Sequence, residues 1–342
     1  MKRVKVILGF IVVALLGLQL AGCSNAQQGK AVEKPAAITI GIQAIPNDEV
    51  LAKAKGWYEK ELGVTVNFKQ FDSGRDVNTA IAAKGIDIGL LGSTPAAIGI
   101  AKGIPYEVFW IHDVEGDNEA LAVKRTANIA SVKDLKGKKV AVPAGSTTHY
   151  SLLNALKLEG VNPADVKILD MQPPDILAAW QRGDIDAAYV WQPTLGKLLS
   201  DGKILVTSRE LASKGIITAD VGIVRKEFAD KYPDLVQKYI RIQSKALELY
   251  KSNPDEAAQA VAKELTIDKA ESLAEMKELI WLSTTEQLSD KYLGTSSKKG
   301  EFAKTLKATA DFLVEQKAID AAPGIEVFEK AVNPQYIEAA VK

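Results

Sequence analysis

The sequence is poor in the residues from which disulfides, metal sites and catalytic dyads are usually built. Its 342 residues include one cysteine, Cys23, and two histidines, His112 and His149. A single thiol excludes an intrachain disulfide and any multi-thiolate metal site. Two isolated histidines lack the spacing of metal ligands. We therefore expect neither a bound metal nor a cofactor.

The sequence also has no net charge. Lys and Arg total 43, as do Asp and Glu, so the formal charge is zero. Proteins that bind nucleic acids generally carry a basic surplus, so we expect no nucleic-acid partner. The length suffices for about two domains, each with its own core.

The first 23 residues are expected to be a lipoprotein signal peptide. A basic start precedes an apolar run over 6–19, which is short for a membrane span. The run ends in Leu20-Ala21-Gly22-Cys23, which resembles the lipobox of bacterial lipoproteins, where the cysteine is lipidated and becomes the mature N-terminus. The polar residues 24–36 predict a flexible tether. We expect an extracytoplasmic protein held to the membrane by acyl chains.

The remaining sequence alternates predicted strands and helices, which favours an α/β fold with mainly parallel sheets. Strands are expected at 38–42, 64–68, 86–92 and 106–112, and the pattern restarts at Glu119, with later strands at 166–171, 185–191 and 217–226. Segments 80–95 and 178–193 follow the same order of helix, basic-Gly pair, Ile-Asp and apolar strand. Two similar lobes with a hinge and a cleft between them are predicted, with ligand-binding loops at the carboxyl ends of strands.

One cluster of small polar residues precedes a predicted helix. Ser146, Thr147, Thr148 and His149 stand directly before the apolar positions of that helix. A nucleophile with its base is disfavoured, because Ser146 and His149 match no known triad and no G-x-S-x-G elbow is present. A helix start binds anions through its unpaired amides, and hydroxyls add donors. A plain N-cap would explain one hydroxyl but not the cluster.

Ser93 and Thr94 precede Pro95 and a second predicted helix, and they favour the same interpretation. Two helix starts, one in each lobe, would hold one anion from both sides.

Three further side chains are candidates for contact with a cationic group of the ligand. Asp220 interrupts an apolar strand, so it either pairs with a protein group or receives a ligand ammonium. Glu119 is a weaker case of the same kind. Trp191 ends a strand and forms either a pocket wall or part of the core.

The segments 71–95, 108–124, 136–157 and 169–193 together resemble the taurine-binding proteins of ABC importers, within the wider group of aliphatic-sulfonate and nitrate-type solute-binding proteins. The resemblance extends from about Ile38 to about Phe228 and is weaker after Pro233. It implies a two-lobe fold of the type II periplasmic binding proteins, with 37–120 and 223–342 as lobe 1 and 121–222 as lobe 2. It also implies no catalytic residues, a monomer, and delivery of ligand to a permease and its ATPase.

The resemblance implies sulfonate donors at Ser93, Thr94 and the 146–148 cluster, an ammonium partner at Asp220, and a Trp191 ring over the methylenes of taurine. The expected ligand-binding set is Gln43, Ser93, Thr94, Glu119, Ser146, Thr147, Thr148, His149, Trp191, Gln192 and Asp220. The loop 41–48 and Gln192 depart from the family pattern, which puts the exact sulfonate in question. A lipid anchor in place of free secretion suggests a Gram-positive cell.

Other functions of the same fold group stay open. They are binding of nitrate, binding of a pyrimidine precursor of thiamine, and a pyrimidine-precursor synthase, which the lipobox disfavours. Asp220 discriminates among the transport ligands, because an alkanesulfonate would leave its buried charge unpaired.

Overall fold

The computed structural model describes residues 33–342, and the chain from Lys34 onward forms one compact unit. The predicted signal peptide, Cys23 and most of the predicted tether lie outside the described residues. Within the described part of the chain, no helix is both long and apolar enough to cross a membrane.

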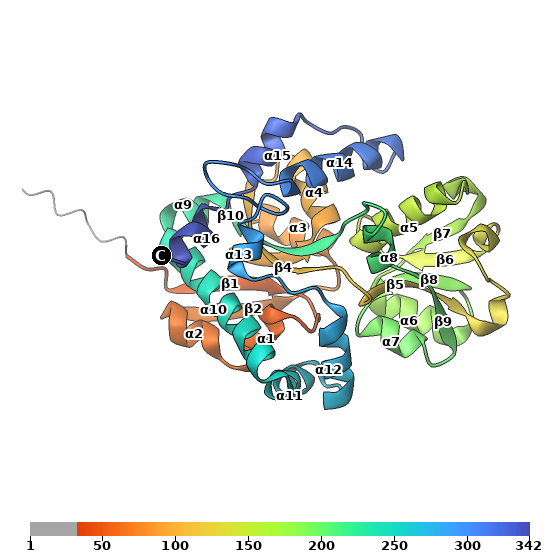
Figure 1. Ribbon diagram of the computed structural model, residues 1–342, viewed down its shortest axis with the longest axis horizontal. Coiled ribbons are helices and arrows are strands. Elements are labelled where there is room, and N and C mark those ends of the chain that lie inside the picture. The colour runs from red at the N-terminus through yellow and green to blue at the C-terminus, as the bar shows by residue number, and fades with distance from the viewer. Residues whose placement is uncertain (1–32) are drawn as a thin grey trace, which may run out of the picture. The chain divides into compact units, whose positions relative to one another are not determined.

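The first lobe is built on a five-stranded sheet with the order β2-β1-β3-β10-β4 (Figure 1). Its strands are β1 (Ala37–Ile42), β2 (Thr65–Gln70), β3 (Ile88–Gly92), β4 (Tyr106–Val114) and β10 (Ala219–Arg225). The first three pair in parallel, whereas β10 is antiparallel to both of its neighbours.

Helices from both ends of the sequence pack around this sheet, and the C-terminal ones are blue in Figure 1. They are α1 (Asp48–Ala54), α2 (Trp57–Leu62), α3 (Gly74–Ala82), α4 (Ser93–Ala101), α9 (Lys226–Lys231), α10 (Pro233–Ser252), α11 (Pro254–Leu265), α12 (Lys269–Glu278), α13 (Thr284–Gln287), α14 (Phe302–Glu315), α15 (Ile325–Ala331) and α16 (Gln335–Ala340).

The second lobe repeats the arrangement with the order β7-β6-β8-β5-β9. Its strands are β5 (Glu119–Lys124), β6 (Lys139–Val142), β7 (Lys167–Asp170), β8 (Ala187–Trp191) and β9 (Gly202–Thr207). Its helices are α5 (Thr147–Leu158), α6 (Pro173–Arg182), α7 (Thr194–Leu198) and α8 (Ser208–Ala212), with short 3-10 turns at Arg125–Ala127, Val132–Leu135 and Pro163–Asp165. Two separate apolar clusters, centred on Leu152 and Trp180, cover the two faces of this sheet. The α/β fold with two lobes is confirmed.

The lobe boundaries differ by a few residues from those expected. Residue 222 falls inside β10, all of which pairs within the first sheet, so the second lobe ends before Ala219. Residues 119–120 belong to β5 and therefore to the second sheet. The chain thus crosses between the lobes at 115–118 and again just before Ala219.

Two local features differ from what the sequence pattern indicates. The apolar pattern of 50–61 predicts one helix, but the segment forms parts of two helices, because Gly56 adopts a left-handed conformation with φ of 63° between them. Strand β9 was not predicted, since it carries exposed residues such as Ile204 and lies at the edge of its sheet.

The lobes also contact each other away from the crossovers in the sequence. Lys157 on α5 forms a salt bridge of 2.9 Å with Glu315 on α14. Tyr150 on α5 packs edge-on against Phe312, with 5.3 Å between ring centroids. Arg75 at the start of α3 reaches Asp170 at the end of β7 over 2.8 Å. The two lobes therefore meet in a closed arrangement.

Candidate functional site

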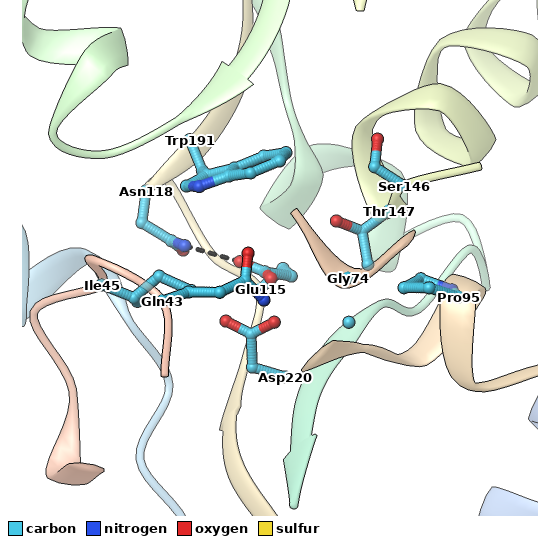
Figure 2. A pocket seen from close by; sticks show the side chains of 11 residues that line it. Gln43, Ile45, Gly74, Pro95, Glu115, Asn118, Ser146, Thr147, Trp191 and Asp220 are labelled. Carbon is cyan, nitrogen blue, oxygen red and sulfur yellow. Dashed lines mark hydrogen bonds between the residues drawn. The ribbon is translucent and has the colours of Figure 1, made fainter. Parts of the chain in front are cut away.

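A small pocket lies between the lobes (Figure 2). The pocket lies at the carboxyl ends of strands, where open α/β sheets bind ligands. Its lining residues come from both lobes and are Gln43, Ile45, Gly74, Gly92, Pro95, Glu115, Asn118, Ser146, Thr147, Trp191 and Asp220.

One side of the pocket is formed by the start of α5. Ser146 is the N-cap, and its hydroxyl accepts a 3.1 Å hydrogen bond from the backbone N–H of His149. The same hydroxyl donates to the carbonyl of Pro143 over 2.6 Å. Thr147 donates its hydroxyl proton to the Glu119 carboxylate. Both hydroxyl protons are engaged, so the first amides of the helix are the donors that remain for an anion.

Two further helices begin at the same pocket. Gly74 is the first residue of α3, and Gly92 is the N-cap of α4. The hydroxyls of Ser73 and Thr94, beside these starts, are buried and have no hydrogen-bond partner among the described residues. Three helices of nine or more residues thus direct the positive ends of their dipoles to one place. This side of the pocket is suited to an anion with several oxygens.

The opposite side carries carboxylates. Asp113, Glu115 and Asp220 are 0%, 3% and 4% exposed, and an oxygen from each lies within 4.8 Å of the others. Burial raises the pKa of Asp113 to about 8, with the Asp48 carboxylate adding to the effect. Burial, reinforced by neighbouring carboxylates, holds the pKa values of Glu115 and Asp220 well above their usual range. This cluster has the geometry to surround one small cation.

Strand register places Asp220 in this cluster. In the antiparallel ladder, Asp220 lies opposite Asp113 on β4 and opposite Gly92 on β3. A register shift follows at once between Asp220 and Val221. Such irregularities redirect side chains at the rims of sheets. Like charges placed directly opposite are destabilising, so this pairing favours a function in ligand binding.

Glu115 comes from the first crossover between the lobes. Its backbone N–H donates to the carbonyl of Thr218 over 3.0 Å, which ties the two crossovers together. Asn118 donates to the Glu115 carboxylate over 2.5 Å and accepts from the Gly116 amide over 2.8 Å. Gly116 has no room for a side chain, because a Cβ would lie 2.0 Å from the carbonyl oxygen of Glu278.

Trp191 forms the wall that joins the two ends of the pocket. It ends β8 in the second lobe and packs against the apolar cluster of Ile45, Leu90 and Leu279 in the first. Gln43 donates to the carbonyl of Leu90 over 3.2 Å, which holds its amide at the pocket. The pocket-wall interpretation of Trp191 is therefore supported over the core interpretation.

The structure brings five of the predicted residues to the pocket, namely Gln43, Ser146, Thr147, Trp191 and Asp220. Ser93, Thr94 and Thr148 lie directly behind it on α4 and α5, and the Ser93 hydroxyl accepts from the amide of Ala219 over 3.2 Å. His149 accepts from the Gly145 amide over 3.2 Å, and burial lowers its pKa.

Glu119 and Gln192 are directed away from the pocket. Glu119 accepts from Thr147, from Ser208 at 2.6 Å and from Ser151 at 3.4 Å, so it positions α5. Burial raises its pKa to about 7. Gln192 donates to Glu278 over 3.0 Å across the lobes. Neither is among the described residues that line the pocket, so direct ligand contact by these two stays a prediction.

Several pocket residues were not predicted, chiefly Gly74, Glu115 and Asn118. Gly74 is the last residue of the FDSG sequence, in which a helix start was visible but only one hydroxyl was present. Glu115 and Asn118 lie in the polar stretch 115–118, which looks like an ordinary exposed loop. The family model described as NMT1/THI5 like matches residues 48–257, which include all three of these positions.

Proteins of known identity match over most of the chain. The taurine-binding periplasmic protein of Escherichia coli is 39% identical over 83% of this chain and 88% of its own length. A putative aliphatic sulfonates-binding protein of Bacillus subtilis is 31% identical over 91% of both chains. Among solved structures, the alkanesulfonate-binding protein SsuA of Xanthomonas axonopodis bound to MOPS aligns with a TM-score of 0.73 and 22% identity, over 88% of this chain and 99% of its own. That similarity establishes the type of fold.

Proposed function

Since the chain belongs to the NMT1/THI5-like family, we propose that it is the extracytoplasmic solute-binding protein of an ABC importer for taurine or a closely related amino-sulfonate. The protein would act as a monomer that delivers its ligand to a permease, which an ATPase drives. The relatives that match over most of the chain are named as binding proteins. We therefore propose no catalytic step.

One observation carries this proposal: the two ends of the pocket attract charges of opposite sign. The starts of α3, α4 and α5 lie at one end and the carboxylates of Asp220 and Glu115 at the other. A sulfonate has three oxygens for the amide donors, and an ammonium group suits the carboxylates. Trp191 lies between these ends, where its ring would cover the two methylenes of taurine (Figure 2).

A general alkanesulfonate binder is the second candidate, and the Bacillus subtilis relative favours it. Such a ligand has no cation and would leave the buried polar side chain of Asp220 without a hydrogen-bond partner, which is costly. A nitrate ion would occupy only the helix starts. The cation end therefore favours taurine over both.

Calorimetry tests the proposal directly. Protein comprising residues 24–342 would be titrated with taurine, ethanesulfonate and nitrate. We expect taurine to bind at least about tenfold more tightly than ethanesulfonate, because a hydrogen bond to a charged group contributes roughly 1.5–3 kcal/mol. Equal affinities would support the general sulfonate binder, and absence of binding by all three would reject the sulfonate class.

We also propose that Cys23 carries the lipid anchor and that the protein is held at the outer face of the cell membrane, as suits a Gram-positive cell. Cys23→Ala is expected to abolish acyl labelling and to move the protein from the detergent phase to the aqueous phase on Triton X-114 partitioning, because a diacyl anchor dominates membrane affinity. Mass spectrometry of the N-terminal peptide gives the processing site. An unmodified mature N-terminus upstream or downstream of Cys23 would contradict this.

A further inference from the structure

Helix α14 of the first lobe contacts helix α5 of the second through four side chains, which we call the α5–α14 contact. Tyr150 and Phe312 pack edge to face, with 5.3 Å between ring centroids and 83° between ring planes. The Lys157 ammonium lies 5.2 Å from the centroid of the same Phe312 ring and 2.9 Å and 3.0 Å from the two carboxylate oxygens of Glu315. None of the four is among the described residues that line the pocket, so ligand contact does not explain them.

Helix α5 uses two different faces for the two lobes. Leu152 and Leu156 belong to an apolar cluster of the second lobe. At 3.6 residues per turn, Tyr150 and Lys157 lie on nearly the opposite side of the helix. That side is free to face α14 of the first lobe.

Helix α14 is divided in the same way. Leu306 and Ala310 belong to the core of the first lobe, beside α4. The helical period places Phe312 and Glu315 on the other side of α14, which faces α5. Figure 1 shows α14 next to α4. Each helix is thus fixed in its own lobe and offers a second face to the other lobe.

The two rings depend on each other for their burial. Tyr150 is only 9% exposed, and Phe312 is half-buried. Neither ring belongs to an apolar cluster of either lobe among the described residues. Separation of the lobes would therefore expose apolar surface on both rings, which costs free energy.

The α5–α14 contact and the ligand pocket share one helix. Thr147, in the first turn of α5, lines the pocket and approaches Gly92 so closely that a Cβ there would lie 2.7 Å from its Cγ2. Lys157 follows ten residues later, about 15 Å along the helix axis. A movement that withdraws Thr147 from Gly92 would carry Tyr150 and Lys157 away from α14.

We propose that Phe312 and Glu315 are positioning residues for the ligand. By holding Tyr150 and Lys157, they keep α5 in its closed position and so slow the release of ligand. This inference rests on the proposed function, because it takes the start of α5 as part of the ligand site. A ligand enters while the lobes are apart and this contact is not formed, so the rate of association should not depend on it. The contact thus sets how long a ligand stays and not which ligand is chosen.

Stopped-flow fluorescence tests the proposal on protein comprising residues 24–342, with Trp191 in the pocket as the reporter. Phe312→Ala should raise the dissociation rate of taurine about fivefold, the size expected for the loss of one aromatic pair. The association rate should change by less than about twofold. Ethanesulfonate should dissociate faster by the same factor, because the contact acts on the lobes and not on the ligand.

A charge reversal tests the ion pair separately. Glu315→Lys brings two ammonium groups together and should raise the dissociation rate about two- to threefold at low salt, as expected for an exposed pair. The effect should shrink at about 1 M salt, where the Debye length is about 3 Å. Adding Lys157→Glu restores opposite charges and should return the rate to near the wild-type value. A structural defect in α14 would not be repaired by a substitution in the other lobe.

Tyr232→Ala is the matched control for the loss of a ring. Tyr232 packs on Phe228 within the first lobe, with 5.1 Å between ring centroids. Its removal should lower the melting temperature without changing the dissociation rate of taurine. Faster dissociation in this variant as well would show that the rate reports general loosening of the first lobe, which would overturn the proposal.

The outcomes keep the two proposals apart. An unchanged dissociation rate in Phe312→Ala, or an effect confined to association, would overturn the positioning role and leave the proposed function intact. Slower dissociation would also overturn it, since the contact would then favour separated lobes. If neither taurine nor ethanesulfonate binds, the proposed function fails, and small-angle scattering by the ligand-free proteins decides about the contact. A larger radius of gyration for Phe312→Ala than for the wild type would support its role in holding the lobes together, and equal radii would overturn it.

Discussion

Asp220→Asn is expected to lower the affinity for taurine at least about 100-fold while changing that for ethanesulfonate by less than about threefold. Removing one partner of a buried, hydrogen-bonded charge pair typically costs 2–5 kcal/mol. The Asp220 carboxylate faces the pocket and accepts no hydrogen bond from the described residues, so a ligand cation would be its main partner. Calorimetry with both ligands measures the change. Equal losses of affinity for taurine and for ethanesulfonate would instead indicate that the substitution disturbs the whole pocket.

The same substitution should stabilise the ligand-free protein. The pKa of Asp220 is raised in the folded state by burial and by Asp113, relative to about 3.9 in the unfolded chain. Above about pH 4 the unfolded chain loses this proton while the folded protein retains it, so stability falls as the pH rises through the folded pKa. Asparagine does not titrate, so Asp220→Asn removes this pH-dependent loss of folding stability.

Thermal unfolding at pH 5 and pH 8 measures this effect. The gain in melting temperature of Asp220→Asn over the wild type should be larger at pH 8. His149 acts in the opposite sense, because burial lowers its pKa, but it is present in both proteins and cancels in the comparison. A loss of stability at both pH values would mean that Asp220 has a structural partner.

Gly92→Ala is expected to weaken ligand binding by about tenfold or more without unfolding either lobe. Gly92 is the N-cap of α4 with a φ of −64°, a conformation that alanine adopts readily. A Cβ there would lie 2.7 Å from Cγ2 of Thr147, which belongs to the other lobe. The clash exists only when the lobes are closed, and overpacking of this kind costs roughly 1–3 kcal/mol.

A second substitution distinguishes this clash from other defects. Thr147→Ser removes the clashing Cγ2 but keeps the hydroxyl that donates to Glu119. The Gly92→Ala, Thr147→Ser double variant should therefore recover most of the lost affinity. Small-angle scattering with ligand should show less compaction for Gly92→Ala than for the wild type. Wild-type affinity in the single variant would refute the need for this close approach.

The sequence contained enough to predict the helix start at Ser146 and the acid at Asp220, because each breaks a local pattern. A cluster of hydroxyls exceeds what a cap needs, and a carboxylate in an apolar strand requires a partner. Glu115 and Asn118 break no pattern, since acidic and amide residues are ordinary in loops. Their importance arises from the crossover between lobes, which is a property of the whole chain.

The direction in which side chains point was the second property that the sequence could not reveal. Glu119 and Gln192 lie within a few residues of the pocket, yet one faces the hydroxyls of Thr147 and Ser208 and the other faces Glu278. These partners come from other parts of the chain, so local sequence could not reveal them. The position of β10 between β3 and β4 in the first sheet was hidden for the same reason.

Because β10 follows the second lobe in the sequence but pairs in the first sheet, the two sheets are completed in a fixed order as the chain is synthesised. All strands of the second sheet lie between Glu119 and Thr207, so that lobe can assemble as one continuous stretch. The first sheet stays open between β3 and β4 until Arg225 has emerged. Until then two strands expose unpaired backbone, the condition under which chains associate wrongly. The N-terminal lobe, although made first, is therefore the last to close and the one that most needs protection from aggregation.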